Sequence, residues 1–410
     1  KNNIVKYLKV RGSYGEVGND QIGGDRFLYL PSSYGAASDS GVNKYNFGLA
    51  SNPYTSLMIV ENKIGNPDLT WEKAKKMNVG VDINLFNNCL TASFDIFKEK
   101  RNNILANRST SPMIIGANLP AYNFGEMENR GWEMDLNFRH HIQDFHYWAR
   151  FNYSFARNEI IYMDEVQKRY DYQMTTGRRK NQFFGLIFDG YYNSWEEINA
   201  LDRPKSSWSG NQLQPGDVKY VDVNQDGVID DYDMVPIGYT PVPEIIYGFS
   251  FGAQYKGFDF SILFQGADNV SIKYFGRSMW PFAKGEESAK SLIKERWTQE
   301  RSEAGEKITF PRLSLNPNGE TDHNYRPSTL WIRDASYLRL KNLEVGYTFT
   351  GGFVKRLNLN SVRLYFNGSN LFTWTDVVDL DPEAPSRSGN VEINTYPLQK
   401  VYNIGLNINF

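Results

Sequence analysis

Apolar and polar residues alternate one for one along many segments of this chain. In the final segment, the even-numbered residues from Tyr402 to Phe410 are all apolar, and the odd-numbered residues between them are asparagine or glycine. A period of two is the pattern of a β-strand whose two faces meet different surroundings. The alternation predicts about ten strands, at residues 5–14, 76–86, 90–103, 127–140, 144–159, 244–254, 257–269, 336–349, 360–373 and 399–410.

One of these segments changes phase in its middle. In the 336–349 segment, Leu338 and Leu340 are at even-numbered positions, whereas Leu343 and Val345 are at odd-numbered positions. An extra residue in one strand, a β-bulge, restores a single apolar face. The sequence therefore predicts a bulge near Lys341.

The connections between the predicted strands alternate between short and long. The short ones are near residues 87–89, 140–143, 255–256 and 350–359; the long ones are at 15–75, 104–126, 160–243, 270–335 and 374–398. Outer-membrane barrels have short periplasmic turns and longer extracellular loops. The pattern thus favours an all-β fold, a transmembrane antiparallel β-barrel with long extracellular loops. A soluble β-sandwich or propeller is the alternative, but such a fold has no reason to sort its loops onto two ends.

The composition agrees with a wall that meets lipid on one face and water on the other. The 410 residues include 26 Tyr, 26 Phe and 9 Trp, yet the mean hydropathy is −0.54. Aromatic residues near strand ends, such as Phe145, Tyr147, Tyr153 and Phe155, suit a girdle at the membrane interface, although aromatic residues favour strands in any case.

Charge, cysteine content and the first residues exclude several classes. The net charge of −2 gives no basic field for nucleic acid. Cys89 is the only cysteine, which excludes an internal disulfide framework. The sequence has no helical run of about 18 apolar residues. It begins Lys1-Asn2-Asn3-Ile4 without the features of a signal peptide, so we expect any export signal to lie outside this sequence.

Several short motifs resemble one protein family in order along the chain. They are NPDLTWEK at 66–73, MNVGVD at 77–82, NRGWE at 129–133, PGDVKYVD at 215–222, YLRLKNLEVGY at 337–347, NLFTW at 370–374, YP at 396–397 and GLN at 405–407. Together they resemble the SusC/RagA-type TonB-dependent outer-membrane transporters of the Bacteroidetes. The match covers essentially the whole chain, which makes the resemblance specific.

The resemblance implies a barrel of about 22 strands around an internal plug, in the outer membrane of a Gram-negative cell. Its implied partners are a SusD-like surface lipoprotein that acts as a lid, TonB, membrane lipid, and an oligosaccharide or peptide substrate that is actively imported. Residues 1–410 match only the C-terminal part of such a barrel, about ten strands. The plug and the TonB box are not expected in this chain.

The sharpest local motif has the register of an EF-hand-type calcium loop. Oxygen-bearing side chains stand at loop positions one, three, five, nine and twelve, and position six is Gly227. Position seven supplies a backbone carbonyl, and oxygen ligands suit calcium. Position twelve is aspartate rather than glutamate, as in dockerin-like loops. An Asx-rich turn without metal is the alternative. We expect a structural calcium ion in an extracellular loop, held by Asp222, Asn224, Asp226, Val228, Asp230 and Asp233.

Catalytic chemistry is not expected. The only histidines are His140, His141, His146 and His323, and three of them lie at a predicted periplasmic turn. The sequence contains no zinc-protease, nucleophile-elbow, Walker A or Rossmann motif, and no pair of carboxylates stands out. The rival functions are a soluble or surface-anchored all-β glycan-binding protein and a passive porin or adhesin barrel.

Two further groups of residues have open interpretations. Trp148, Arg150, Arg363 and Tyr365 are predicted to face the lumen, where they contact a passing solute or fill space against a plug. The apolar segment 183–192, followed by Trp195, is either a docking surface for a SusD-like lid or a part of the loop's own packing.

Overall fold

The computed structural model describes residues 4–20, 27–30, 35–36, 44–49, 51, 53–60, 64–110, 119–208, 213–274, 280–282, 291–314, 322–378, 380–383, 390–391 and 398–410. The YP motif at 396–397 lies outside these residues.

A single antiparallel sheet of ten long strands dominates the fold, and each strand pairs with the next long strand along the chain. The ten predicted strands are all confirmed, and several are longer than predicted. β1 continues to Asn19 and β8 begins at Tyr122, because backbone pairing extends into polar stretches where the alternation of apolar residues has already ended. In order, the strands are β1 (Val5–Asn19), β6 (Glu72–Leu85), β7 (Leu90–Ala106), β8 (Tyr122–Ile142), β9 (Phe145–Tyr162), β16 (Ile245–Tyr255), β17 (Phe258–Asp268), β20 (Tyr337–Phe349), β21 (Ser361–Thr375) and β23 (Val401–Asn409).

The predicted bulge lies in β20. Opposite β17, the partners of Leu340 and Asn342 are the adjacent residues Phe264 and Leu263, and the register opposite β21 is also irregular at this point. Lys341 is therefore the extra residue, which brings Leu340 and Leu343 onto one face of the sheet. The bulge prediction is confirmed.

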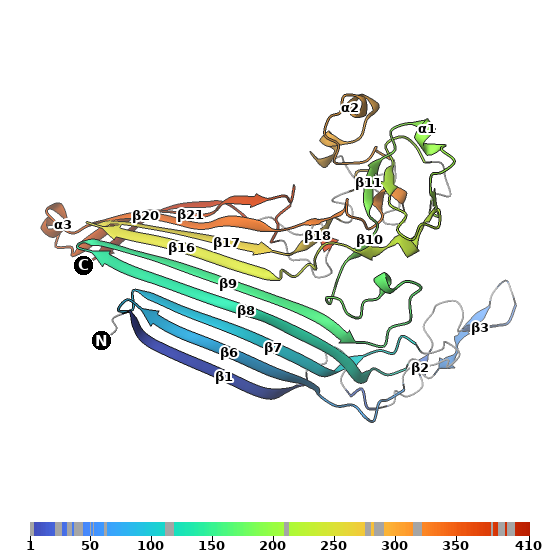
Figure 1. The fold of residues 1–410 in the computed structure, drawn as a ribbon, viewed down its shortest axis with the longest axis horizontal. Coiled ribbons are helices and arrows are strands. Elements are labelled where there is room, and N and C mark those ends of the chain that lie inside the picture. Colours follow the sequence, from blue (N-terminus) through green and yellow to red (C-terminus); the bar gives the residue numbers. More distant parts are fainter. Residues whose placement is uncertain are drawn as a thin grey trace.

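Tight turns join the strands at one end of the sheet (Figure 1). Between β16 and β17 the turn is only Lys256 and Gly257, which have φ values of 44° and 90° as a two-residue hairpin of this kind requires. The turn between β8 and β9 is equally short, and His140, His141 and His146 lie on the paired strand ends that flank it. The fourth short connection, 350–360, contains the helix α3 (Phe353–Arg356).

The long connections emerge at the opposite end, as predicted, and contain short elements (Figure 1). They include small strand pairs and two short helices, α1 (Trp195–Ile198) and α2 (Gln299–Glu303). The small strands are β2 (Gly35–Ala36), β3 (Lys44–Phe47), β4 (Tyr54–Leu57), β5 (Ile59–Val60), β10 (Phe184–Gly185), β11 (Phe188–Tyr191), β12 (Lys205–Ser206), β13 (Val218–Tyr220), β14 (Val228–Ile229), β15 (Val235–Pro236), β18 (Ser271–Tyr274), β19 (Ile332–Asp334) and β22 (Asn390–Val391).

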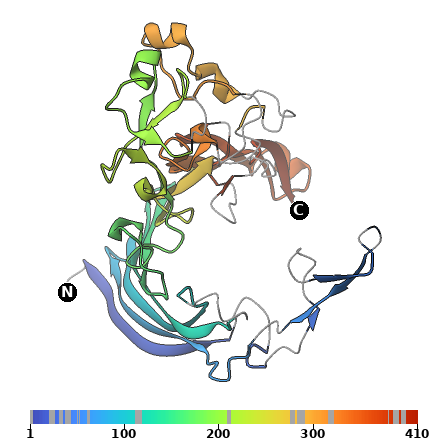
Figure 2. The same ribbon diagram turned by 90° about the vertical axis from the view of Figure 1, so that its right-hand side faces the viewer.

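The sheet curves into an arc when viewed along its strands (Figure 2). Within the described residues, β1 and β23 are its two outer strands. The fold is thus a part of a barrel wall, as the sequence predicted. No helix in the described parts of the chain is long and apolar enough to cross a membrane.

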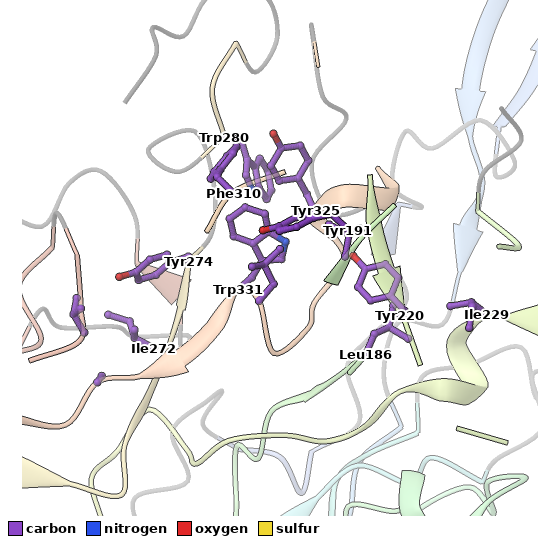
Figure 3. Close-up of a cluster of buried hydrophobic side chains, with 14 of the residues drawn as sticks. Leu186, Tyr191, Tyr220, Ile229, Ile272, Tyr274, Trp280, Phe310, Tyr325 and Trp331 are labelled. Carbon is purple, nitrogen blue, oxygen red and sulfur yellow. The ribbon is translucent and has the colours of Figure 1, made fainter. Parts of the chain in front are cut away.

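The principal hydrophobic core lies in the connections and not in the sheet. The described residues of segments 163–244 and 269–336, here called the loop unit, pack together around a cluster of aromatic rings (Figure 3). The core residues of the loop unit are Leu186, Tyr191, Val218, Tyr220, Ile229, Val270, Ile272, Tyr274, Trp280, Phe310, Tyr325, Leu330, Trp331 and Ala335, and Val377 from the connection after β21 joins them.

The apolar segment 183–192 contributes to this packing. Leu186, Tyr191 and Tyr192 are buried, and Phe188 packs against the core. Of the two interpretations of this segment, internal packing is therefore correct, because β10 and β11 pair with β15 and β13 and turn their apolar side chains inward. Trp195 in α1 stays exposed.

Candidate functional site

One face of the sheet is apolar and is left uncovered by the rest of the described chain. Val79, Ile96, Val345, Leu364 and Ile404 come from five different strands, and each is exposed. Exposing such a surface to water is unfavourable, whereas contact with hydrocarbon is favourable. This face therefore has the chemistry of a lipid-facing wall.

Aromatic rings gather on the apolar face at the end of the sheet where the turns are short. The ring of Phe145 lies 5.3 Å from that of Tyr147 and 6.1 Å from that of Tyr255. Phe258 and Tyr347 form a second group, with ring centroids 4.5 Å apart. Amphipathic rings in this position are typical of a girdle at a membrane interface. Of the other predicted girdle residues, Tyr153 stacks on Trp132 nearer the middle of the wall.

The opposite face carries charged clusters that bind strands together. Arg11 of β1 lies between two carboxylates of the neighbouring strands: its Nε is 3.1 Å from Asp82 of β6 and its Nη1 is 2.5 Å from Asp95 of β7. A Cβ atom at Gly80 would lie 2.7 Å from Cζ of Arg11, so glycine leaves the space that the guanidinium crosses. One arginine thereby links three strands on the polar face.

A second cluster repeats this arrangement near the other edge of the sheet. Arg363 of β21 binds both carboxylate oxygens of Asp259 in β17, and its Nη2 is 2.6 Å from Glu344 in β20. Gly346 again leaves the space, since a Cβ atom there would lie 2.6 Å from Nη2 of Arg363. The alternation in the sequence predicts that Arg363 faces the lumen. The sequence does not predict which residues of β17 and β20 it pairs with.

The four residues predicted to face the lumen lie on this polar face and form two stacked pairs. The guanidinium of Arg150 lies 5.3 Å from the ring of Trp148, and that of Arg363 lies 4.8 Å from the ring of Tyr365. The rings cover glycines of the next strand, at Gly252 and Gly405. Arg150 is exposed. Of the two interpretations, these contacts favour side chains that fill space along the polar face. Arg150 is the residue of the four that is exposed and accessible to a solute.

Two buried ionic groups attach the connections to the wall. Glu244, at the start of β16, accepts hydrogen bonds from Arg157 of β9 and from Arg179 in the loop unit. Arg339 of β20 is buried and binds Asp381 at 2.6 Å. Burial by itself raises the pKa of the Asp381 carboxyl, but Arg339 and two backbone N–H groups outweigh it and hold that pKa below its usual range. These ion pairs leave no local pattern in the sequence, because the partners lie more than 20 positions apart.

The predicted calcium loop curls around its own side chains. Asp222 accepts hydrogen bonds from the backbone N–H groups of Gln225 at 2.7 Å and Gly227 at 2.8 Å, and Asn224 and Asp226 make similar local bonds. Asp230 caps the 3₁₀ turn at 231–233 through the N–H of Tyr232. Val228 lies in the two-residue strand β14.

Asp233, at position twelve, lies buried beneath the loop. Its Oδ1 accepts the N–H of Val223 at 2.8 Å and its Oδ2 that of Asp230 at 2.9 Å. Burial raises the pKa of this carboxyl in spite of these bonds, and the nearby Asp222 acts in the same direction. Among the described residues, no three His, Cys, Asp or Glu side chains are gathered as ligands of one metal ion. Calcium binding therefore stays a prediction.

Comparison with known proteins identifies the family. Residues 3–371 match the family model described as TonB dependent receptor-like, beta-barrel. The chain is 28% identical to TonB-dependent receptor P3 of Formosa agariphila, with 100% of this chain and 40% of that protein covered. It is 26% identical to TonB-dependent receptor SusC of Bacteroides thetaiotaomicron, with 100% of this chain and 38% of that protein covered.

A solved structure shares the fold. The RagAB peptide transporter structure matches with a TM-score of 0.71 and 23% identity, over 100% of this chain and 41% of that one. The chain thus spans about two-fifths of the length of the relatives it matches. The family consists of transporters and not of enzymes, and its barrels lie in the outer membrane. The chain therefore belongs to the TonB-dependent receptor-like β-barrel family, is similar to SusC in sequence and to the RagAB transporter in fold, and forms a C-terminal part of an outer-membrane barrel.

Proposed function

We propose that the complete protein imports oligosaccharides or peptides across the outer membrane, with energy delivered through TonB. The observation that carries this proposal is the two-faced curved wall. One face is exposed and apolar, and the other carries arginine and carboxylate clusters that suit a hydrated lumen or a plug. In this proposal residues 1–410 are the C-terminal portion of the barrel, and the plug and TonB box belong to other parts of the complete protein.

A SusD-like lipoprotein lid is the proposed partner on the outer surface. The loop unit lies at the end of the sheet with the long connections, which faces the outside of the cell in barrels of this class. The loop unit has its own aromatic core, which stabilises the surface that a partner would contact. Trp195 in α1 is exposed, and exposed aromatic residues of this kind are enriched at protein interfaces. The relative named the RagAB peptide importer supports peptides as one substrate class, and the relative named SusC supports the family assignment.

Uptake measurements on cells that express the complete protein test the import proposal. Labelled oligosaccharides and labelled peptides are offered in parallel, with and without functional TonB. We expect saturable uptake of one class, and a loss of at least about tenfold when TonB is absent, because active import needs that energy. Uptake that persists without TonB identifies a passive porin instead, and no uptake of either class with intact TonB contradicts the proposal.

We also propose that residues 222–233 bind one structural calcium ion. Asp222, Asn224, Asp226, Asp230 and Asp233 supply the side-chain oxygens and Val228 a backbone carbonyl. The hydrogen bonds to backbone N–H groups already curl the loop, and each carboxylate oxygen of Asp222 retains a second lone pair. A cation here would offset the repulsion among four carboxylates and fix a long connection of the loop unit.

The calcium proposal predicts a matched pair of binding results. After removal of divalent ions, terbium(III) is added to the complete protein in detergent, and its luminescence is excited through Tyr232, which lies within the loop. We expect calcium to displace terbium in the wild type. Asp226→Asn, which removes one charge from the ligand set, should weaken calcium binding by about tenfold or more. Gln225→Asn alters a side chain outside the ligand set and should bind as the wild type does. Equal binding by the two variants would refute the ligand assignment.

A further inference from the structure

A cavity of about 820 Å³ lies at the short-turn end of the sheet, on its apolar face. Its walls come from three places: the β16–β17 turn, the ends of β20 and β21, and α3 with the residues before it. The volume is within the range of cavities that hold a small organic ligand, about 300–1,000 Å³. The residues that define it are Gly257, Tyr347, Phe349, Phe353, Val354 and Val362.

The helix α3 forms one side of this cavity and presents apolar side chains outward. Val354 is only 4% exposed and fastens the helix to the strand ends, whereas Phe353 is 73% and Leu357 is 52% exposed. Phe353 at the start of α3 and Leu357 directly after its end therefore leave apolar side chains exposed beyond the ends of the strands. Figure 1 shows α3 at that end of the wall.

Three cations lie on the segments that form the cavity. Lys256 lines it, and Lys355 and Arg356 are exposed on α3 directly after the lining residue Val354. The segments 350–360 and 254–258 contain no Asp or Glu. Among the described residues, none of these three cations has a carboxylate partner within ion-pair distance. An apolar cavity formed by segments that carry unpaired cations is complementary to a molecule with an apolar tail and an anionic head.

The position of the cavity in the membrane indicates which class of amphipathic molecule would bind there. The chain lies in an outer-membrane barrel, whose short turns face the periplasm. The cavity is continuous with the lipid-facing surface and lies beside the ring group of Phe258 and Tyr347, at the level where headgroups meet hydrocarbon. We propose that the cavity is a binding site for one anionic phospholipid of the periplasmic leaflet: an acyl chain enters the cavity, and the phosphate lies against Lys256, Lys355 and Arg356.

This site is independent of the import proposal, because it needs only the barrel and the membrane. Interfacial helices bind lipid surfaces through the burial of their apolar side chains and through the attraction of their basic side chains to anionic lipid. Each basic residue near an anionic headgroup adds to the affinity for the lipid. The bound lipid would fasten the β16–β17 turn to α3 across the end of β20, where the N–H of Thr348 donates a hydrogen bond of 2.8 Å to the carbonyl of Gly257.

Native mass spectrometry of the complete protein, extracted in mild detergent and incubated with phosphatidylglycerol or phosphatidylethanolamine, tests the site. We expect the wild type to retain one phosphatidylglycerol in clear preference to phosphatidylethanolamine. The triple variant Lys256→Gln, Lys355→Gln, Arg356→Gln should reduce the retained phosphatidylglycerol by about tenfold or more, because three charges near the headgroup are lost. Heat-modifiable gel migration shows that each variant is folded.

A second variant tests the cavity itself without altering any charge. Gly351 lines the cavity, has no neighbouring heavy atom within 4 Å of a Cβ position, and lacks a positive φ. Gly351→Trp can therefore fill the cavity without backbone strain, and it should abolish the preferential retention. Arg139→Gln is the control, since Arg139 is an exposed cation at the same end of the sheet but on the polar face. Equal retention of the two lipids by the wild type, or undiminished retention by either the triple variant or Gly351→Trp, overturns the proposal.

Discussion

Replacing Ile404 by arginine should lower the stability of the complete barrel in lipid by about 2–4 kcal/mol, whereas arginine at the adjacent Asn403 should change it little. Ile404 lies on the apolar face in the middle of β23 and is 80% exposed. A charged side chain there must leave water for hydrocarbon, or must bend toward the interface at a cost.

Asn403 points to the other face and makes a well-matched control. It lies opposite Asn367 of β21, whose amide group donates a hydrogen bond of 3.0 Å to Glu344. An arginine at position 403 therefore enters a polar neighbourhood that already contains a carboxylate. The backbone consequences of the two substitutions are the same, because the two positions are neighbours in one strand.

Urea unfolding of the complete protein in lipid vesicles, followed by tryptophan fluorescence, measures both effects. The difference between Ile404→Arg and Asn403→Arg is the informative quantity, since it cancels the intrinsic cost of arginine in a strand. Similar stabilities of the two variants would mean that the two faces of β23 do not meet different solvents, and the lipid-facing assignment of the apolar face would fail.

Truncating Trp331 to alanine should destabilise the loop unit by about 3–5 kcal/mol, the usual cost of removing a buried aromatic side chain. Trp331 is 2% exposed at the centre of the ring cluster (Figure 3). Its ring lies 5.4 Å from that of Phe310 and 5.3 Å from that of Tyr325, and its Nε1 donates to the carbonyl of Asn324 at 2.8 Å. The substitution removes packing and leaves a buried acceptor without this donor.

Hydrogen exchange with mass spectrometry resolves where the loss occurs. We expect faster exchange across the described parts of 184–236 and 308–335 in Trp331→Ala, and unchanged exchange in β6 to β9, because the loop unit has a core of its own. Trp195→Ala is the control: it removes the same side chain from a position that is 52% exposed in the same unit. Unchanged protection of the loop unit in Trp331→Ala would show that the ring cluster does not stabilise it.

The sequence by itself determined the sheet. A period of two reports which side chains share a face, and it placed all ten long strands, the bulge at Lys341 and the end of the sheet from which each long connection emerges. This information is local, because each residue in a two-faced wall is selected by the solvent on its own side. The lumen-facing prediction for Arg363 rests on the same alternation.

Only the tertiary structure decided what the long connections do. They show no sustained periodicity, and the contacts that fold them join distant positions: the carboxylate of Asp217 accepts a hydrogen bond of 2.8 Å from Asn324, 107 residues away. A partner at such a separation is chosen by packing and by the need to satisfy buried polar groups, and neither leaves a local pattern. The sequence of segment 183–192 is therefore compatible with a docking surface as well as with a hydrophobic core. The pairing of β10 and β11 and the burial of apolar side chains in this segment decide for the core. The charged clusters have the same origin, since alternation assigns Arg363 to a face but the register of three strands gives it Asp259 and Glu344.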